Sequence, residues 1–231
     1  MSAVATGAAL LALAASPLRV VVHPGETTTI TVRNLGAAAA SVAAAPNAYR
    51  LDLRGRPQLA AASRSWLIVG KRRFALAPRR GTEVAVRVVA PRGARPGDHA
   101  QVLLFSAAAL GVRGVRVAVR VGVVVVVRCP GILRRRLAPL ALSARRTARG
   151  PVLRLLLRNA GNVDEWVSSK RLVVRVWRGS RRLAVLRPRP RRLLAGARGL
   201  FEWSLARRVT GRVSIVVSTG AKPERRYRLR L

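Results

Sequence analysis

The chain has 231 residues, of which 50% are hydrophobic and 4% aromatic, and its formal charge is +37 from 45 Lys and Arg against 8 Asp and Glu. This length suffices for two domains of about 100 residues each, and the hydrophobic fraction excludes a largely disordered chain. The single cysteine, Cys129, excludes an internal disulfide and any zinc site built on cysteines.

The positive charge has two interpretations. Nearly all the cations are arginine, since Lys71, Lys170 and Lys222 are the only lysines. One interpretation is an anionic partner, such as nucleic acid, anionic lipid or an acidic cell-wall polymer. The other is codon bias, because Ala, Arg, Gly, Pro and Val are all encoded by GC-rich codons. The scarcity of aromatic stacking platforms and the lack of a nucleic-acid motif disfavour nucleic acid.

Residues 1–16 form an apolar run without a charge, and they contain an A-x-A site at Ala12 and Ala14. This pattern is typical of the hydrophobic core and cleavage region of a secretory signal peptide. The basic start of such a peptide is missing, so either translation begins further upstream or the export signal is weak. Arginines interrupt every later apolar segment, so we expect an exported mature chain without a transmembrane helix.

Between residues 17 and 131 the sequence predicts about seven strands with turn signals every 8 to 12 residues, which is typical of a Greek-key sandwich. The alanine-rich segment that follows Gly36 is assigned to strand and loop, because Pro46 breaks it early. In chain order the clear strands are 18–22, 27–33, 63–69, 74–77, 83–90, 100–107 and 115–127.

The last of these strands lies within residues 111–131 and is the strongest signal in the chain. Between Val115 and Val121 the valines occupy every second position, which predicts a half-buried strand. From Val123 to Val127 they are continuous, which predicts burial on both faces or an edge open to a partner. We expect this strand to close the first domain at Pro130.

After a basic linker at 132–136 the sequence predicts a second set of strands, at 139–142, 151–158, 171–177, 182–186, 200–205, 212–218 and 227–231. The turn that begins at Asn159 contains Gly161 and Asn162, residue types that tolerate left-handed backbone. No helix is predicted. The fold class is therefore all-β, with two tandem immunoglobulin-like β-sandwich domains, 17–131 and 132–231, after a signal-peptide-like segment, 1–16.

The order PLRVVVHPGETTTITVRN, SWLIV, FALAPRRGTEVAVRVVAP and ARPGDHAQVLLF, followed by the valine strand, resembles the first domain of PapD-like periplasmic pilus-assembly chaperones. It is also similar to exported bacterial domains of the WxL-interacting proteins of the Gram-positive cell surface. In PapD-like chaperones the last strand is donated to an incomplete pilin subunit, and a basic pair holds the terminal carboxylate of the subunit.

This resemblance implies Arg19 as the first-strand member of the basic pair and Arg116 or Arg120 as the last-strand member. It implies that the donated apolar face consists of Val117, Val119 and Val121. The last strand carries no lysine, but an arginine is able to hold a carboxylate through two hydrogen bonds. The alternative is that residues 115–127 form an interior strand of their own sandwich.

Enzyme motifs are absent: the sequence holds no G-x-G-x-x-G, G-x-x-x-x-G-K-[ST], G-x-S-x-G or H-E-x-x-H. His23 and His99 both lie beside turn residues, and adjacent strand residues such as Asp98 and His99 point to opposite faces. We therefore expect no catalytic residue, no metal site and no cofactor.

The expected function is that of an exported, non-enzymatic cell-envelope protein that binds another envelope or surface protein, as an assembly chaperone or a surface accessory factor does. The alternative is a module that binds a polyanion, such as an anionic cell-wall polymer, through an arginine-rich stretch. Pro188 and Pro190 within this stretch predict an extended, solvated loop. Its eight arginines are Arg175, Arg178, Arg181, Arg182, Arg187, Arg189, Arg191 and Arg192.

Overall fold

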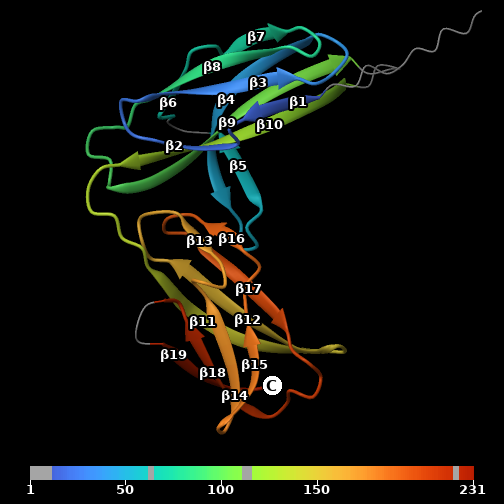
Figure 1. Ribbon diagram of the computed structural model, residues 1–231, viewed down its shortest axis with the longest axis vertical. Helices are drawn as coiled ribbons and strands as arrows, with labels where there is room; N and C mark the ends of the chain where they lie inside the picture. The colour runs from blue at the N-terminus through green and yellow to red at the C-terminus, as the bar shows by residue number, and fades with distance from the viewer. Residues whose placement is uncertain (1–11, 62–64, 111–115, 221–223) are drawn as a thin grey trace, which may run out of the picture. The chain divides into compact units, whose positions relative to one another are not determined.

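The computed structural model describes residues 12–61, 65–110, 116–220 and 224–231, which form strands and connections without a helix (Figure 1). The expectation of an all-β chain is therefore confirmed for the described residues. They contain no helix long and apolar enough to span a membrane. The chain divides into two compact units. The first takes Met1–Tyr49, Leu59–Arg95 and His99–Pro130, and the second takes Arg50–Gln58, Pro96–Asp98 and Gly131–Leu231.

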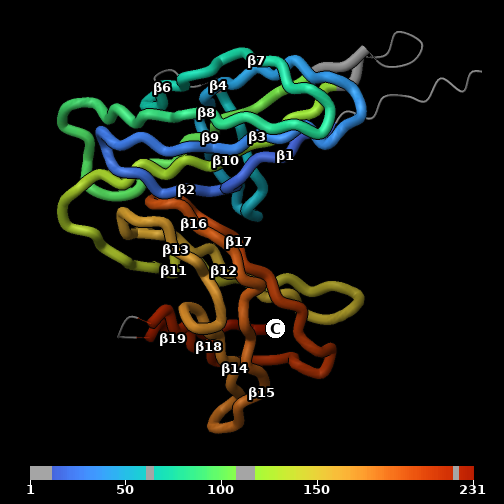
Figure 2. The backbone as a smooth tube through the Cα atoms, turned by 45° about the horizontal axis from the view of Figure 1, so that its top comes forward, coloured from blue at the N-terminus to red at the C-terminus, as the bar shows by residue number. Residues whose placement is uncertain are grey.

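The first unit is a sandwich of two sheets. One sheet has the order β1 (Leu13–Ser16), β3 (Thr27–Asn34), β8 (Gly81–Val88) and β6 (Leu67–Val69). The other has the order β2 (Arg19–Val22), β10 (Arg116–Cys129), β9 (Gly97–Leu110), β4 (Ala40–Leu51) and β5 (Pro57–Ala61), and β7 (Arg73–Leu76) also pairs with β4. Figure 2 shows β2, β10 and β9 lying side by side.

The core of this unit follows from the period of its strands. Alternate residues of a strand point to the same face, and the buried residues of both sheets form one cluster. Ile30 and Val32 of β3 come from one sheet, and Leu103 and Phe105 of β9 come from the other; all four have no exposed surface. The alternating apolar residues of the sequence are thus the residues that hold the two sheets together.

Strand β1 was not expected from the sequence. Leu13 is buried, β1 pairs antiparallel with β3, and the N–H of Leu35 donates to the carbonyl of Ala12 over 2.7 Å. The segment assigned to a signal peptide, residues 1–16, therefore overlaps β1, and cleavage after Ala14 would remove half of this strand. Residues 1–11, which hold the rest of the signal-like segment, lie outside the described residues.

The alanine-rich segment after Gly36 forms strand and turn, as expected, and its strand β4 continues through Pro46. Pro46 pairs with Leu103 of β9, so the ladder on that side is kept. On the other side the N–H of Ala44 donates to Arg72, and pairing with β7 ends at Ala43. Backbone groups alternate in direction along a strand, so the backbone of Pro46 faces the same side as that of Ala44, toward β7. Since β7 no longer pairs with β4 at this position, no hydrogen bond is lost through the missing N–H of Pro46, and the proline is tolerated.

The second unit is also a sandwich. Its sheets have the orders β11 (Leu137–Thr147), β12 (Gly150–Asn159) and β17 (Arg198–Ser204); β13 (Glu165–Val167) and β16 (Arg191–Leu193); and β15 (Arg181–Leu186), β14 (Val173–Arg178), β18 (Arg212–Ser218) and β19 (Arg225–Arg230). Leu155 of β12, Val174 of β14 and Ile215 of β18 are fully buried in one cluster. This confirms the expected two-sandwich architecture.

The arginine-rich stretch is not one solvated loop, as its prolines had predicted. It contains parts of β14 and β16 and the whole of β15, and only residues 179–180 and 187–190 connect these strands. Pro188 in that connection is buried. The strands form because the stretch alternates apolar and basic residues, so that Val174 and Val176 enter the core while Arg175 between them faces outward.

The turn after β12 also differs from expectation. Neither Asn159, Gly161 nor Asn162 has a positive φ. Gly161 is required by a close approach, since a Cβ built there would lie 2.2 Å from the carbonyl oxygen of Arg134. The turn therefore needs glycine for space and not for left-handed backbone.

Candidate functional site

The candidate site in the first unit is the open edge of β10. Strand β2 pairs in parallel with β10 only from Val124 to Val127, and the N–H of Val124 donates to the carbonyl of Leu18 over 3.0 Å. Before Val124, β10 has no ladder partner on that side among the residues that the structure describes. Since backbone groups alternate in direction, Ala118, Arg120 and Gly122 direct their N–H and C=O groups to this open edge.

The side chains of β10 change from half-buried to buried along the strand. Val119 and Val121 are partly buried and pack against the core of the unit, whereas Val123 and Val125 have no exposed surface. The predicted apolar face therefore points toward the sandwich interior but keeps some exposure in its first half. Arg116 and Val117 belong to β10, but their side chains lie outside the described residues.

The expected basic pair is not brought together. Arg19 lies opposite Val124 in the register of β2 and β10. Arg120 is four residues earlier on β10, about 13 Å away along the strand, and Arg116 is about twice as far. Arg120 is exposed and Arg19 is half-buried. The register that separates them comes from a long-range parallel pairing, which the local sequence pattern does not encode.

The eight arginines of the second unit have different environments. Four of them are engaged with neighbours in their own unit. Arg175 forms an ion pair with Glu224, Nη1 to Oε1 over 3.1 Å, and Arg178 donates to the carbonyl of Thr210. Arg191 lies 4.1 Å from the ring centre of Phe201 and donates to the carbonyl of Leu200 over 2.6 Å.

The fourth engaged residue, Arg192, lies 5.6 Å from the ring centre of Trp166. Burial lowers the pKa of the Arg191 guanidinium. The other four, Arg181, Arg182, Arg187 and Arg189, are exposed, and so is Arg178. The stretch therefore does not form a single basic patch, because some of its guanidinium groups contact carboxylates, carbonyls or aromatic rings while others are exposed to solvent.

Sequence reasoning missed a second group of arginines, on β18 and β19. Arg226 lies in register with Val216, Arg228 with Ser214, and Arg230 with Arg212. All four arginines are exposed. The alternation of basic and apolar residues from Arg226 to Leu231 is the sequence signal that could have located them on one face.

The acidic residues serve structural contacts. Glu165 is buried, and its Oε1 lies 3.5 Å from Nη1 of Arg135 and 3.4 Å from Nη2 of Arg171. Asp164 accepts a hydrogen bond from the N–H of Ala195 over 3.1 Å. The described residues contain no cluster of three His, Cys, Asp or Glu side chains that could hold a metal ion.

Comparison with known proteins gives structural matches only: no protein-family model matches the sequence, and no curated protein sequence is similar to it. The structure is similar to that of the E. coli chaperone DraB, with a TM-score of 0.50 and 14% identity over 96% of this chain and 98% of that one. A chain of the complex of the Salmonella enterica SafA pilin with the SafB chaperone gives a TM-score of 0.52 and 14% identity, over 96% and 97% of the two chains.

A third match is a chain of a chaperone–tip adhesin complex of CFA/I fimbriae biogenesis, with a TM-score of 0.52 and 10% identity over 95% of this chain and 98% of that one. Each match covers both units of the chain. At these identities the similarity concerns the fold. The chain has the fold of the PapD-like pilus chaperones, with two immunoglobulin-like domains.

Proposed function

We propose that this chain is an exported, non-enzymatic cell-envelope protein that binds another envelope or surface protein through the open edge of β10. The observation that carries the proposal is that β2 covers only Val124–Val127 of β10. A strand whose backbone groups lack partners binds an extended segment by strand addition, in which main-chain hydrogen bonds give affinity and alternate side chains give register. The likeness to chains from chaperone–pilin and chaperone–adhesin complexes supports a protein partner.

In this arrangement the partner strand hydrogen-bonds to the backbone of Ala118, Arg120 and Gly122. Val119 and Val121 supply half-exposed apolar contacts on the inner face, and Val117 continues the same alternation. On the outer face the exposed Arg120 is available to anionic groups of the partner, Arg116 remains the other candidate of this strand, and Arg19 lies at a separate position beside Val124. The basic residues thus act at successive points along the strand and not as one clamp.

Photocrosslinking in the source cells tests the binding edge. We expect benzoyl-phenylalanine at Ala118 to crosslink a defined envelope protein, whereas the same group at Arg87, exposed on β8 of the other sheet, does not. Arg120→Pro removes a backbone donor from the open edge, and Arg120→Gln removes only the charge. Crosslinking through Ala118 should fall further for Arg120→Pro than for Arg120→Gln. Equal crosslinking from Ala118 and Arg87 would exclude this edge.

Export is tested by deleting residues 1–11, which leaves β1 intact. We expect the shortened chain to fold and to remain in the cytoplasm, because the signal-like apolar run is lost. Cell fractionation measures this, with the full chain as control. Unchanged export of the shortened chain would contradict the export part of the proposal.

A second candidate function is polyanion binding by the second unit. The observation that favours it is a groove in which Arg187, Arg189 and Arg191 lie together with Phe201 and Trp203. Such a groove offers a linear anion the charge of its arginines and the partly exposed ring of Trp203. We expect Arg187→Gln/Arg189→Gln to elute from immobilised heparin at lower salt than the full chain. The control, Arg207→Gln/Arg208→Gln, removes two exposed charges from a turn of the same unit, and equal elution of the two double variants would exclude the groove.

A further inference from the structure

The open edge of β19 in the second unit is formed by three arginines. Strand β19 ends its sheet, and within the described part of the chain it pairs with β18 alone. Beyond its last residue, Leu231 and Gly211 exchange both backbone hydrogen bonds, each over 2.9 Å. In an antiparallel pair every second residue bonds to the same neighbour, so Leu229 and Tyr227 also face β18. Arg226, Arg228 and Arg230 therefore direct their N–H and C=O groups away from β18, to the open edge.

The side chains of the same three residues lie on the outer face of the sheet. Tyr227 and Leu229 pack against the core, whereas Arg226, Arg228 and Arg230 are exposed. None of the three guanidinium groups forms a hydrogen bond or an ion pair with another residue in the described part of the chain. The nearby carboxylate of Glu224 is held by Arg175 at 3.1 Å, so the charge along β19 is not neutralised by it.

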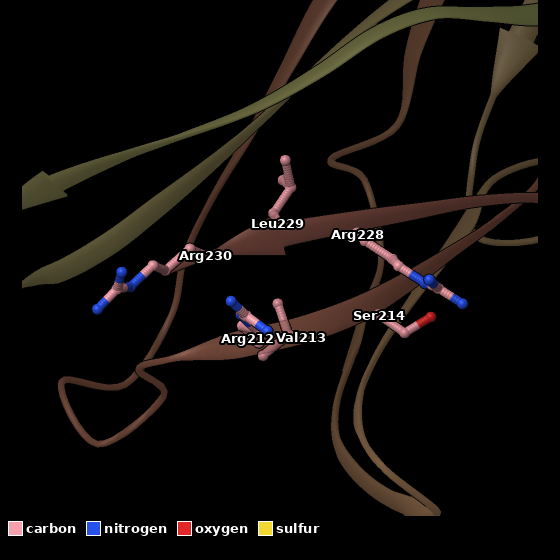
Figure 3. Close-up of a pocket in the computed structure, with 6 residues that line it drawn as sticks. All are labelled: Arg212, Val213, Ser214, Arg228, Leu229 and Arg230. Atoms are coloured by element: carbon pink, nitrogen blue, oxygen red, sulfur yellow. The ribbon is translucent and has the colours of Figure 1, made fainter.

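The open edge adjoins a groove of about 480 Å³. Figure 3 shows its six lining residues, with Leu229 projecting from β19 on the side opposite to Arg228. The lining residues of the groove are Arg212, Val213, Ser214, Arg228, Leu229 and Arg230.

We propose that the β19 edge binds an extended acidic segment of a partner protein by strand addition, with alternate Asp or Glu residues facing Arg226, Arg228 and Arg230. Alternate residues of a strand are about 6.6 Å apart, so the carboxylates of such a segment repeat at the same distance as the arginines. Residues directly opposite in a hydrogen-bonded pair share a face, with Cα atoms about 5.5 Å apart. Each carboxylate then lies within reach of one guanidinium.

The open backbone edge favours a polypeptide over other polyanions as the partner. A nucleic acid or a polyphosphate meets the charge of the outer face, but it has no peptide groups to pair with the N–H and C=O groups of Arg226, Arg228 and Arg230. Only a polypeptide satisfies both sets of groups at once. This site lies in the second unit and does not depend on the role proposed for β10.

Fluorescence anisotropy with the full chain and labelled peptides tests the proposal. The probe is a seven-residue peptide in which Glu alternates with Thr, and its control has the same composition with the glutamates contiguous. We expect the alternating peptide to bind more tightly. Arg226→Gln/Arg228→Gln/Arg230→Gln should weaken its binding by roughly tenfold, since three exposed ion pairs of ordinary strength are lost. Arg149→Gln/Arg207→Gln/Arg208→Gln removes three turn arginines and should leave binding within about twofold.

The backbone contribution is measured on the peptide, which avoids any change to the folded chain. N-methylation of the glutamates blocks the N–H groups that face β19, and N-methylation of the threonines blocks those that face away. We expect binding to be lost in the first case and kept in the second. Equal effects of the two methylations, equal affinity of the two peptide isomers, or tighter binding of an oligothymidylate would overturn the proposal and leave a general polyanion surface.

Discussion

At the scale of single residues, the two units share one buried asparagine arrangement. Asn34 ends β3, Asn159 ends β12, and both residues have no exposed surface. The amide of Asn34 donates to the carbonyl of Ala38 over 2.7 Å, and that of Asn159 donates to the carbonyl of Val163 over the same distance. In each case the residue two positions later donates its N–H to the side-chain oxygen. Each asparagine thus stabilises the loop after its strand with both its amide nitrogen, as a donor, and its amide oxygen, as an acceptor.

The first prediction concerns Asn159, whose amide also donates to the carbonyl of Leu193 over 3.1 Å. Asn159→Ala leaves two buried carbonyls without this partner, whereas the N–H of Gly161 keeps a bond to the carbonyl of Arg136 over 3.2 Å. A buried polar group without a partner costs about 1–3 kcal/mol, so we expect the free energy of unfolding to fall by about 3 kcal/mol. Urea denaturation measures it. Asn47→Ala, which removes only an exposed bond to Ala45, should stay within about 0.5 kcal/mol; similar losses for both would contradict the assigned role.

Cys129 gives the second prediction. Its side chain is 2% exposed, and burial raises the pKa of its thiol. The folded chain therefore holds the neutral thiol, out of reach of reagents that need the thiolate. We expect a thiol reagent at pH 8 to modify Cys129 only after unfolding in urea. Modification of the native chain at the rate of a free cysteine would show that this end of β10 opens.

The same shift has a definite sign for stability. The thiol ionises first in the unfolded chain, where its pKa is about 8.5, so its contribution to stability is complete below that pH and is lost as the pH rises above it. The difference in stability between the natural chain and Cys129→Ala should therefore shrink from pH 8 to pH 10. Urea denaturation at the two pH values measures this difference, and a difference that grows would contradict the direction of the shift.

At the scale of elements, β10 divides into a half whose backbone edge is open and a half whose edge pairs with β2. Val123 and Val125 belong to the core, while Val119 and Val121 pack against it with part of their surface exposed. All four are valines that point to the same face of the sheet, so the difference in their burial comes from the residues that cover them. Strand β2 begins to pair where the valines become fully buried.

The third prediction compares two valines on this face. Val125→Ala removes two buried methyl groups and leaves a cavity, so we expect the free energy of unfolding to fall by about 2 kcal/mol. Val119→Ala should cost about half as much, because its side chain is only partly removed from water. In the crosslinking experiment through Ala118 the order should reverse, with Val119→Ala the more harmful. Equal losses of stability would show that the two halves of β10 are equally buried.

The period of the sequence predicted the longer strands because each of them shows several alternations. It missed β1, β5, β13 and β16, which have three to five residues each and are too short to show several alternations. It also could not give register. The pairing of Arg19 with Val124, which separates the expected basic pair, depends on residues about a hundred positions apart in the chain. The sequence showed where the arginines are dense, but the faces on which they lie depend on which strands are neighbours in a sheet.

At the scale of the whole molecule, alternate residues of each strand point to opposite faces, so that the arginines lie on the outer faces while the apolar residues form the two cores. Arg154 lies between the buried residues Leu153 and Leu155, and its side chain meets Glu202 on the neighbouring strand over 3.0 Å. Each core cluster contains only uncharged residues. With 45 basic against 8 acidic residues, the carboxylates are too few to compensate the cations, so the folded chain carries a large net repulsion.

The last prediction follows from that repulsion. Raising the ionic strength from 0.01 M to 0.1 M shortens the Debye length from about 30 Å to about 10 Å. Repulsion between exposed guanidinium groups then weakens more in the folded chain than in the expanded unfolded chain, where the same charges lie further apart. We expect the urea midpoint to rise with sodium chloride over this range. Glucose at matched osmolality, which adds no charge, should leave the midpoint nearly unchanged. A midpoint that falls with added salt would mean that the ion pairs of Glu165, Glu202 and Glu224 outweigh the repulsion among the arginines.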